Sequence, residues 1–259
     1  MKLATRRDFV KGLSVLAPVI VTNGFATSPQ RVQTSEISID NLLLRNARAR
    51  GGLSKLGWVR TVDSLIAIEE QGARLIGRYR ATRNGLMRID VFLGDKRVAS
   101  EGVDESGNWE WPGDKPAPSP APEVAKGILE RGIEKNLYSL HEQAARGAKF
   151  SIEGREVVGS TNFYVVRSLA KDGFETFMLF DPTDWLVKRS RDFRSLHPTA
   201  DATKKWMEDE YEAFRWSQGI RDSYASKKID RTTGKVAQQT TVLRQVYNRP
   251  AGELDLAGC

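Results

Sequence analysis

Residues 149–194 read KFSIEGREVVGSTNFYVVRSLAKDGFETFMLFDPTDWLVKRSRDFR. The stretch contains four segments rich in Val, Ile, Phe, Tyr and Trp, which are separated by residues 159–160, 171–173 and 181–184. The separators contain Gly, Asp and Pro, and these residue types favour tight turns. Short β-rich segments between such turns predict an antiparallel meander of four strands. We take this sheet as the scaffold of the chain.

Further strands are expected on both sides of the meander. The Asn84-Gly85 pair is a strong hairpin signal, and the residues that follow it alternate between apolar and polar. We expect strands at 61–70, 74–82, 86–92, 96–102 and 108–111, and after the meander at 205–216, 224–230 and 235–247.

Two regions have helical patterns. We expect a helix from Asn41, with Asp40 as its N-cap, and a break at Gly51-Gly52. Residues 112–122 contain five prolines and predict an extended connector, which leads to an amphipathic helical region at 123–146. The resulting fold class is α+β, with a large curved antiparallel sheet covered by an N-terminal helix and a helical insertion.

The N-terminus has the pattern of an export signal. Arg6-Arg7 is followed by the apolar residues 13–21 and by a small-x-small cleavage pattern that ends at Ala26. The paired arginines are typical of the twin-arginine route, which predicts a periplasmic protein. We expect a signal peptide at 1–26, a flexible leader at 27–40, a single domain at 41–250 and a C-terminal tail at 251–259.

The charge of the chain is partly that of the predicted signal. Removing its four basic residues and one acidic residue lowers the formal net charge from +7 to +4. The net charge therefore gives little support for binding to nucleic acid. The single cysteine, Cys259, cannot form an intramolecular disulfide.

The search for catalytic chemistry finds little. The chain has two histidines, His141 and His197, and no second histidine follows His141 at the spacing of a zinc-protease motif. No metal site and no cofactor is indicated, and we expect the protein not to be an enzyme. A hydrolase built on Asp181, Asp184 or Glu208 stays as an alternative.

Aromatic residues are plentiful along the predicted strands. Five of the six tryptophans lie on or beside them. A broad sheet must cover its apolar face, and only two helical regions are available for this. Helices lying loosely across a curved sheet would leave an oily cavity, which suits lipid because alkyl chains bind without directional contacts.

This layout resembles the LolA-like periplasmic lipoprotein carriers. The resemblance runs from about residue 41 to 250 and rests on residues 49–53, 84–88, 154–159 and the late hairpin around 219–236. It implies a half-open β-barrel lidded by helices, with a cavity for acyl chains. It also implies ligand-binding residues, chosen by strand alternation: Met87, Ile89, Val91, Phe163, Val165, Phe177 and Leu179.

The expected function is a monomeric carrier of lipoprotein or other lipid-like cargo, which a membrane-bound protein donates or accepts. Known carriers use the general export route, so the twin-arginine signal is a departure. The arginine that controls lipid release in such carriers is not assigned among the many arginines of this chain. The alternative is a periplasmic sensor or assembly protein that acts through an exposed strand edge or through residues 112–122.

Overall fold

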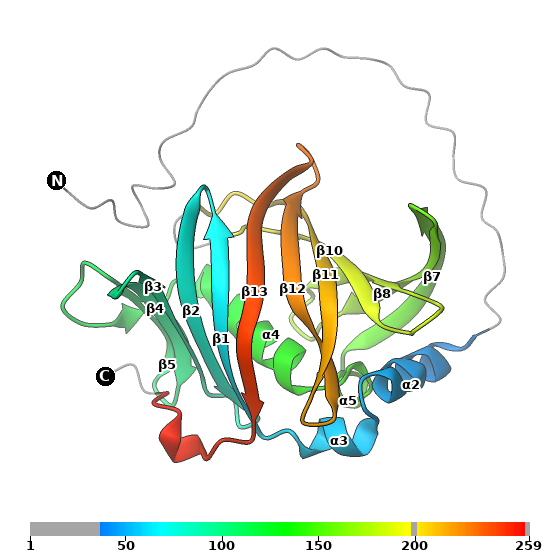
Figure 1. The fold of residues 1–259 in the computed structure, drawn as a ribbon, viewed down its shortest axis with the longest axis horizontal. Coiled ribbons are helices and arrows are strands. Elements are labelled where there is room, and N and C mark those ends of the chain that lie inside the picture. The colour runs from blue at the N-terminus through cyan, green and yellow to red at the C-terminus, as the bar shows by residue number, and fades with distance from the viewer. Residues whose placement is uncertain (1–36, 198–200, 257–259) are drawn as a thin grey trace, which may run out of the picture.

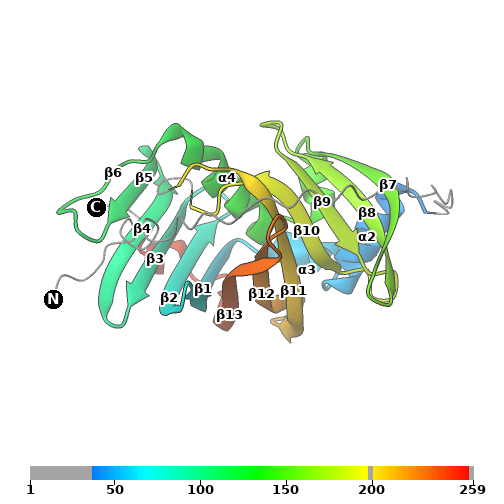
Figure 2. The ribbon, with the colours of Figure 1, turned by 90° about the horizontal axis from the view of Figure 1, so that it is seen from above.

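In the computed structural model, one antiparallel sheet of thirteen strands organises the chain (Figure 1). The structure describes residues 37–197 and 201–256, so the predicted signal at 1–26 and most of the predicted leader lie outside the described residues. The strand order is β6-β5-β4-β3-β2-β1-β13-β12-β11-β10-β9-β8-β7. Seen from above, the strands follow an arc, and α4 lies inside it (Figure 2). The predicted α+β class with a curved sheet and a helical insertion is confirmed.

The N-terminal helix begins earlier than predicted. Helix α2 spans Ile39–Ala49, and the hydroxyl of Ser38 accepts a hydrogen bond from the amide of Asn41. The predicted N-cap at Asp40 is therefore wrong. Asp40 lies in the first turn, where a carboxylate is favoured by the helix dipole.

The predicted break after this helix is confirmed. Helix α3 spans Leu53–Trp58. Gly51 and Gly52 separate the two helices with φ angles of 121° and 90°, a region that favours glycine. A Cβ on Gly51 would lie 2.3 Å from the carbonyl oxygen of Gly219, so the close approach also needs glycine.

The strands before the helical insertion follow the sequence prediction closely, and Asn84-Gly85 lies in the β2–β3 turn as expected. The connector of residues 112–122 contributes only a two-residue strand at the sheet edge. The strands are β1 Thr61–Glu70, β2 Ala73–Thr82, β3 Met87–Leu93, β4 Lys96–Asp104, β5 Gly107–Pro112 and β6 Ser119–Pro120.

The insertion forms two helices, α4 at Glu123–Leu137 and α5 at Leu140–Ala145. Tyr138 has extended backbone angles, and Ser139 caps α5 in a capping box with Glu142. Helix α4 continues through Gly127 and Gly132, and the cap at Ser139 sets the boundary between the two helices. Among the helices of the described residues, none is long and apolar enough to cross a bilayer.

The predicted meander is confirmed, and the last strand joins the two halves of the sheet by pairing with β1. Strand β12 starts earlier than the predicted residue 224. The strands are β7 Lys149–Val158, β8 Thr161–Leu169, β9 Glu175–Phe180, β10 Val187–Arg194, β11 Lys205–Ser217, β12 Ile220–Asp230 and β13 Lys235–Tyr247.

The sheet has two distinct faces. The helix-covered face carries α2, α4 and α5, and we call the other side the open face. On the open face of β2–β4, the segment expected to be a C-terminal tail packs against the sheet through the short helix η1 at Ala251–Glu253 and the buried Leu254. The carbonyl oxygen of Leu254 accepts a 2.8 Å hydrogen bond from the buried Arg80.

Candidate functional site

The helix-covered face begins with an apolar core beneath α4. Leu129, Ile133 and Leu137 of α4 pack in one buried cluster with Met87 of β3. Partly buried Ile89 packs against the same cluster. These side chains are spaced by four residues on the helix and by two residues on the strand, so each element presents one face to the other.

A second apolar core lies at the other end of the same face. Leu42 and Leu43 of α2 pack there against residues of β8 and β9. Leu140 and Ala144 of α5 pack against this cluster, so α5 belongs to the second core. The buried strand residues of this second core are Tyr164, Val166, Met178 and Phe180.

Between the two cores the helix-covered face is ionic. Lys135 of α4 donates a 2.7 Å hydrogen bond to the hydroxyl of Tyr211, and its Nζ lies 3.6 Å from Asp209. Arg194 donates a 2.6 Å hydrogen bond to Asp209 and also pairs with Asp192. The expectation of a cavity with few polar groups is therefore wrong for this middle section.

Burial and charge act in opposite directions on the two aspartates of this group. Burial alone would raise the pKa of Asp209, but Lys135 and Arg194 outweigh it and the pKa lies below its usual range. For Asp192, burial dominates and raises the pKa, although Arg194 opposes it. The group is thus a paired, partly desolvated network, which is costly to disrupt.

The seven predicted ligand-binding residues do not share one face. Met87 and Ile89 contact the core under α4, and Val91 follows them in the same alternation. In the meander, Tyr164, Val166, Met178 and Phe180 face the helices, so their neighbours in the alternation point to the open face. These are Phe163, Val165, Phe177 and Leu179. Strand alternation separates two faces, but a strand sequence rich in apolar residues on both does not say which one the helices cover.

Little space is left between the helices and the sheet at the junction of α3 and α4. A pocket at the junction of α3, α4 and the sheet holds about 10 Å³ and is lined by Leu56, Leu137, Tyr138 and Ile220, among others. That volume is close to the room needed by one water molecule. At this junction the helices are closed onto the sheet.

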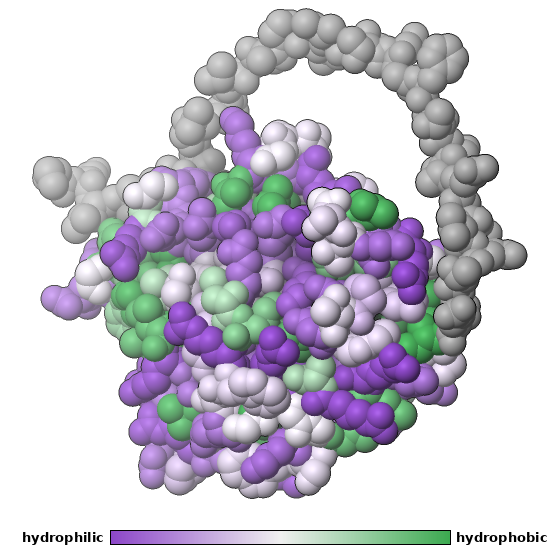
Figure 3. All heavy atoms as spheres, turned by 45° about the vertical axis from the view of Figure 1, so that its right-hand side comes forward, coloured by the Kyte–Doolittle hydropathy of each residue, from purple (hydrophilic) through white to green (hydrophobic). Residues whose placement is uncertain are grey.

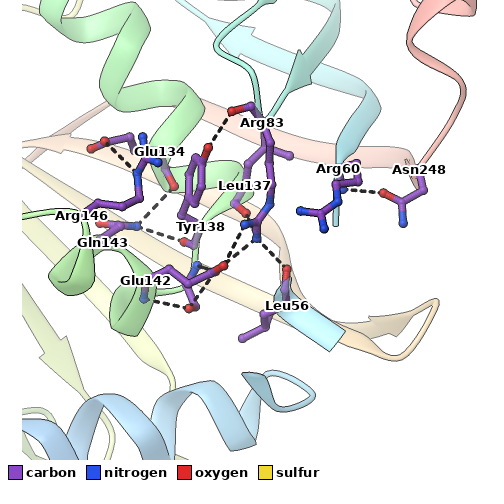
Figure 4. A network of polar contacts seen from close by, with 11 residues as sticks. Leu56, Arg60, Arg83, Glu134, Leu137, Tyr138, Glu142, Gln143, Arg146 and Asn248 are labelled. Atoms are coloured by element: carbon purple, nitrogen blue, oxygen red, sulfur yellow. Dashed lines mark hydrogen bonds and ion pairs between the residues drawn. The ribbon is translucent and has the colours of Figure 1, made fainter. Parts of the chain in front are cut away.

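Arg83 holds this closed arrangement together (Figure 4). It lies in the β2–β3 turn, and its Nη2 donates 2.9 Å hydrogen bonds to the carbonyl oxygens of Leu56 and Leu137, at the ends of α3 and α4. Its Nη1 donates a 2.8 Å hydrogen bond to Glu142 of α5. In return, the hydroxyl of Tyr138 donates to the carbonyl oxygen of Arg83 at 2.6 Å. One arginine therefore ties three helices to one hairpin.

The open face has a hollow of about 450 Å³ over β7–β11. Val165, Phe177 and Trp206 supply its apolar lining. Arg191 and Glu156 also line it, and Arg191 donates hydrogen bonds of 2.6 and 2.8 Å to the two oxygens of Glu156. This contact holds the pKa of Glu156 below its usual range.

The carboxylates considered for a hydrolase have structural partners. Asp181 and Asp184 each accept a hydrogen bond from the backbone amide two residues further on, at 2.8 and 3.1 Å. Glu208 pairs with Arg189 and Arg191, on the opposite face from Asp209 as alternation predicts. Within residues 37–197 and 201–256, no three acidic, histidine or cysteine side chains are placed to hold a metal ion.

Several solved structures share this architecture. A LolA superfamily protein from Nitrosomonas europaea matches with a TM-score of 0.55 and 10% identity, over 84% of this chain and 96% of the other. A putative outer membrane lipoprotein-sorting protein domain from Vibrio parahaemolyticus matches with a TM-score of 0.53 and 8% identity, over 83% and 95%. The fold is LolA-like. No protein-family model matches the sequence, and no curated protein is significantly similar to it.

A third match is a DUF1329 family protein from Desulfovibrio piger, with a TM-score of 0.50 and 10% identity over 83% of this chain and 98% of the other. At such identities the likeness concerns the fold alone. The half-open barrel with its helical lid, which the resemblance in the sequence implied, is thereby supported.

Sequence reasoning missed Arg83 as the residue that joins α3, α4 and α5 to the sheet. The available signal was its place directly before Asn84-Gly85, in a hairpin turn next to the ends of the predicted helices. That signal was weak, because nothing in the sequence shows that α3, α4 and α5 all end beside this turn.

Acid should weaken the lid contacts through Glu142. Burial would raise the pKa of Glu142, but hydrogen bonds from Arg83 and Ser139 outweigh it and hold the pKa below its ordinary value of 4.5. A carboxylate with a lowered folded-state pKa stabilises the fold above 4.5 and loses this contribution as the pH falls through the folded pKa. We expect amide exchange in α4 and α5, corrected for intrinsic rates, to rise as the pH drops below about 4.5.

The Glu142→Gln variant is the control for this prediction. Glutamine does not titrate, so the variant should show faster exchange in α5 at neutral pH and a smaller acid-induced increase than the natural chain. Equal acid-induced increases in the two chains would assign the effect to other carboxylates.

Proposed function

We propose that this protein is a periplasmic carrier of lipid-like cargo, either the acyl chains of a lipoprotein or another lipid. The observation that carries the proposal is the closure of the lid by Arg83. The arginine joins the ends of α3 and α4 and the side chain of Glu142 to one turn of the sheet. Apolar packing of α4 also holds the lid, so opening has to break both this polar contact and the packing of Leu129 and Ile133 on the strands.

In this mechanism, opening separates α4 and α5 from the strands and exposes apolar surface. Met87 and Ile89, with Val91 beside them, would then face the cargo in place of Leu129 and Ile133 of α4. Each CH₂ group of an acyl chain that replaces such contacts contributes about 0.8 kcal/mol. Tyr164, Val166, Met178 and Phe180 offer a second apolar surface at the far end of the same face.

The four predicted meander residues on the open face lie outside the proposed cargo site under the lid. Val165 and Phe177 line the open hollow, which is separated from the lid by the sheet itself. They are not proposed to contact the same cargo as Met87. The ionic group around Asp209 divides the covered face, so cargo beneath the lid would contain a polar part as well as a chain.

The test is to purify the protein from its host and analyse organic extracts by mass spectrometry, followed by titration with a fluorescent acyl probe. We expect extractable lipid, or saturable probe binding at one molecule per chain. Empty protein that also fails to bind the probe would contradict the proposal. A stoichiometric protein partner without lipid would favour a sensor or assembly protein instead.

A further inference from the structure

Three large apolar side chains are exposed at one end of β10–β13, on the open face. Phe193 is 49% exposed, Trp206 is 43% exposed and Val236 is 46% exposed. Phe193 and Trp206 are paired across β10 and β11, and their ring centroids lie 5.8 Å apart. They contribute nothing to the helix-covered core, so the proposed cargo site does not account for them.

Basic residues surround these side chains. Lys204, Lys205, Arg231 and Lys235 are exposed in the same loop and hairpin end. Arg231 is next to Trp206, because its amide donates a 2.9 Å hydrogen bond to the carbonyl oxygen of Trp206. We call the group of Phe193, Trp206, Val236 and these four basic residues the β10–β13 tip.

The acidic side chains at this end are already engaged. Asp230 is buried and accepts a 2.8 Å hydrogen bond from the amide of Thr232. Asp201 accepts one of 2.9 Å from the amide of Thr203. Glu208 pairs with Arg191 below the surface. Lys205 and Arg231 of the tip lie 3.5 and 3.7 Å from the carboxylates of Asp230 and Glu208. Because Glu208 is also paired with Arg189 and Arg191, the four basic residues outnumber Asp201 and Asp230, and the tip presents net positive charge beside exposed aromatic rings.

The shape of the tip suits a broad surface. The β12–β13 hairpin extends beyond the neighbouring strands, at the edge of the molecule opposite α3 (Figure 1). In the space-filling view, hydrophobic side chains form separate patches among hydrophilic ones rather than a long groove (Figure 3). A projecting tip of this kind fits against a bilayer better than it encloses a peptide.

We propose that the β10–β13 tip docks the protein on an anionic lipid surface. Trp and Phe side chains prefer the headgroup region of a bilayer, and lysine and arginine beside them are attracted to anionic lipids. This inference rests on the proposed carrier function, since a carrier must bring its cargo to a membrane. Docking uses the open face and leaves the lid on the other side of the sheet free to move.

The test uses the full chain with a single environment-sensitive fluorophore. Cys259→Ser removes the natural thiol, and Val236→Cys places the label on the tip. The control is Leu243→Cys on the same strand, where Leu243 is 51% exposed but lies away from the hairpin end. The labelled chains are mixed with vesicles of phosphatidylcholine, with or without phosphatidylglycerol.

We expect the emission of the label at 236 to rise and shift to the blue with the anionic vesicles only, while the label at 243 stays unchanged. Comparing the two positions isolates the tip from any binding by the N-terminus. The Arg231→Gln, Lys235→Gln double variant should bind roughly thirtyfold more weakly. Trp206→Ser should weaken binding more than Trp216→Ser, which alters a 60% exposed tryptophan near the other end of β11.

Equal responses at positions 236 and 243, or the same response without the anionic lipid, would overturn the docking proposal. So would equal binding of the Trp206→Ser and Trp216→Ser variants. The assay needs no cargo and no opening of the lid. A protein that docks but holds no lipid refutes the carrier proposal alone, and a protein that holds lipid but does not dock refutes the docking proposal alone.

Discussion

Replacing Arg83 with leucine is expected to release the lid. The substitution removes the hydrogen bonds to the carbonyl oxygens of Leu56 and Leu137 and the ion pair with Glu142. Hydrogen bonds that involve a charged group contribute about 1.5–3 kcal/mol each, less where water competes. We expect the balance between closed and open lid to shift by roughly 2–4 kcal/mol, a factor of about 30 to 1,000.

The measurement is amide exchange along α4 and α5, together with the amount of lipid that co-purifies. Both should rise in the Arg83→Leu variant, while exchange in β11–β13 stays as in the natural chain. Arg60→Leu is the matched control, because Arg60 is an exposed arginine just before β1. If exchange rises uniformly over the whole sheet, Arg83 stabilises the fold in general and does not act as a latch.

Replacing Asp90 with alanine should cause a large loss of stability. Asp90 is 5% exposed and pairs with Arg80, which is 1% exposed. It also accepts hydrogen bonds of 3.0 and 3.1 Å from Nε of Arg88, and another from the hydroxyl of Ser100. Removing the carboxylate leaves the buried guanidinium of Arg80 without its ion-pair partner in the sheet.

Breaking a buried ion pair in this way costs about 3–5 kcal/mol in the free energy of unfolding. For a domain of this size the melting temperature should fall by roughly 6–20 °C. Asp95→Ala is the control, because Asp95 is exposed in the β3–β4 turn and its loss should change stability by about 0.5 kcal/mol or less.

A double variant separates the ion pair from simple packing at this site. Arg80→Met with Asp90→Leu replaces both charges with apolar groups of similar size, and should recover most of the lost stability. A double variant as unstable as Asp90→Ala would mean that the geometry of the pair, and not the stranded charge, matters. Melting curves of the four chains at neutral pH decide between these outcomes.

Turn residues and strand alternation in the sequence were enough to predict most of the sheet. Asn84-Gly85 and the separators of the meander mark turns that depend on local backbone preferences, so they could be read without tertiary information. The start of α2 was misplaced because Ser38 and Asp40 are both good N-caps. The division of residues 123–146 into two helices depends on the capping box of Ser139 and Glu142, a local signal inside a longer amphipathic pattern.

The site was less predictable, because it depends on which elements meet. Alternation grouped Met87 with Ile89 correctly, yet it placed Phe163 and Phe177 on the covered side when Tyr164 and Met178 occupy it. Both faces of the meander carry large apolar residues, so the alternation of residue types does not identify the buried face. Only the packing of the helices distinguishes the two faces.

By itself, the sequence determined that this protein is a large antiparallel sheet with a helical insertion, because turns and alternation act between residues close in the chain. Only the tertiary structure decided that Arg83 joins three helices to the sheet, that ion pairs divide the covered face, and that Phe193 and Trp206 stay exposed. Each of these depends on contacts between residues far apart in sequence. Such contacts depend on the pairing of β13 with β1 and on the packing of the helices against one face of the sheet. Local sequence patterns predict neither of these two arrangements.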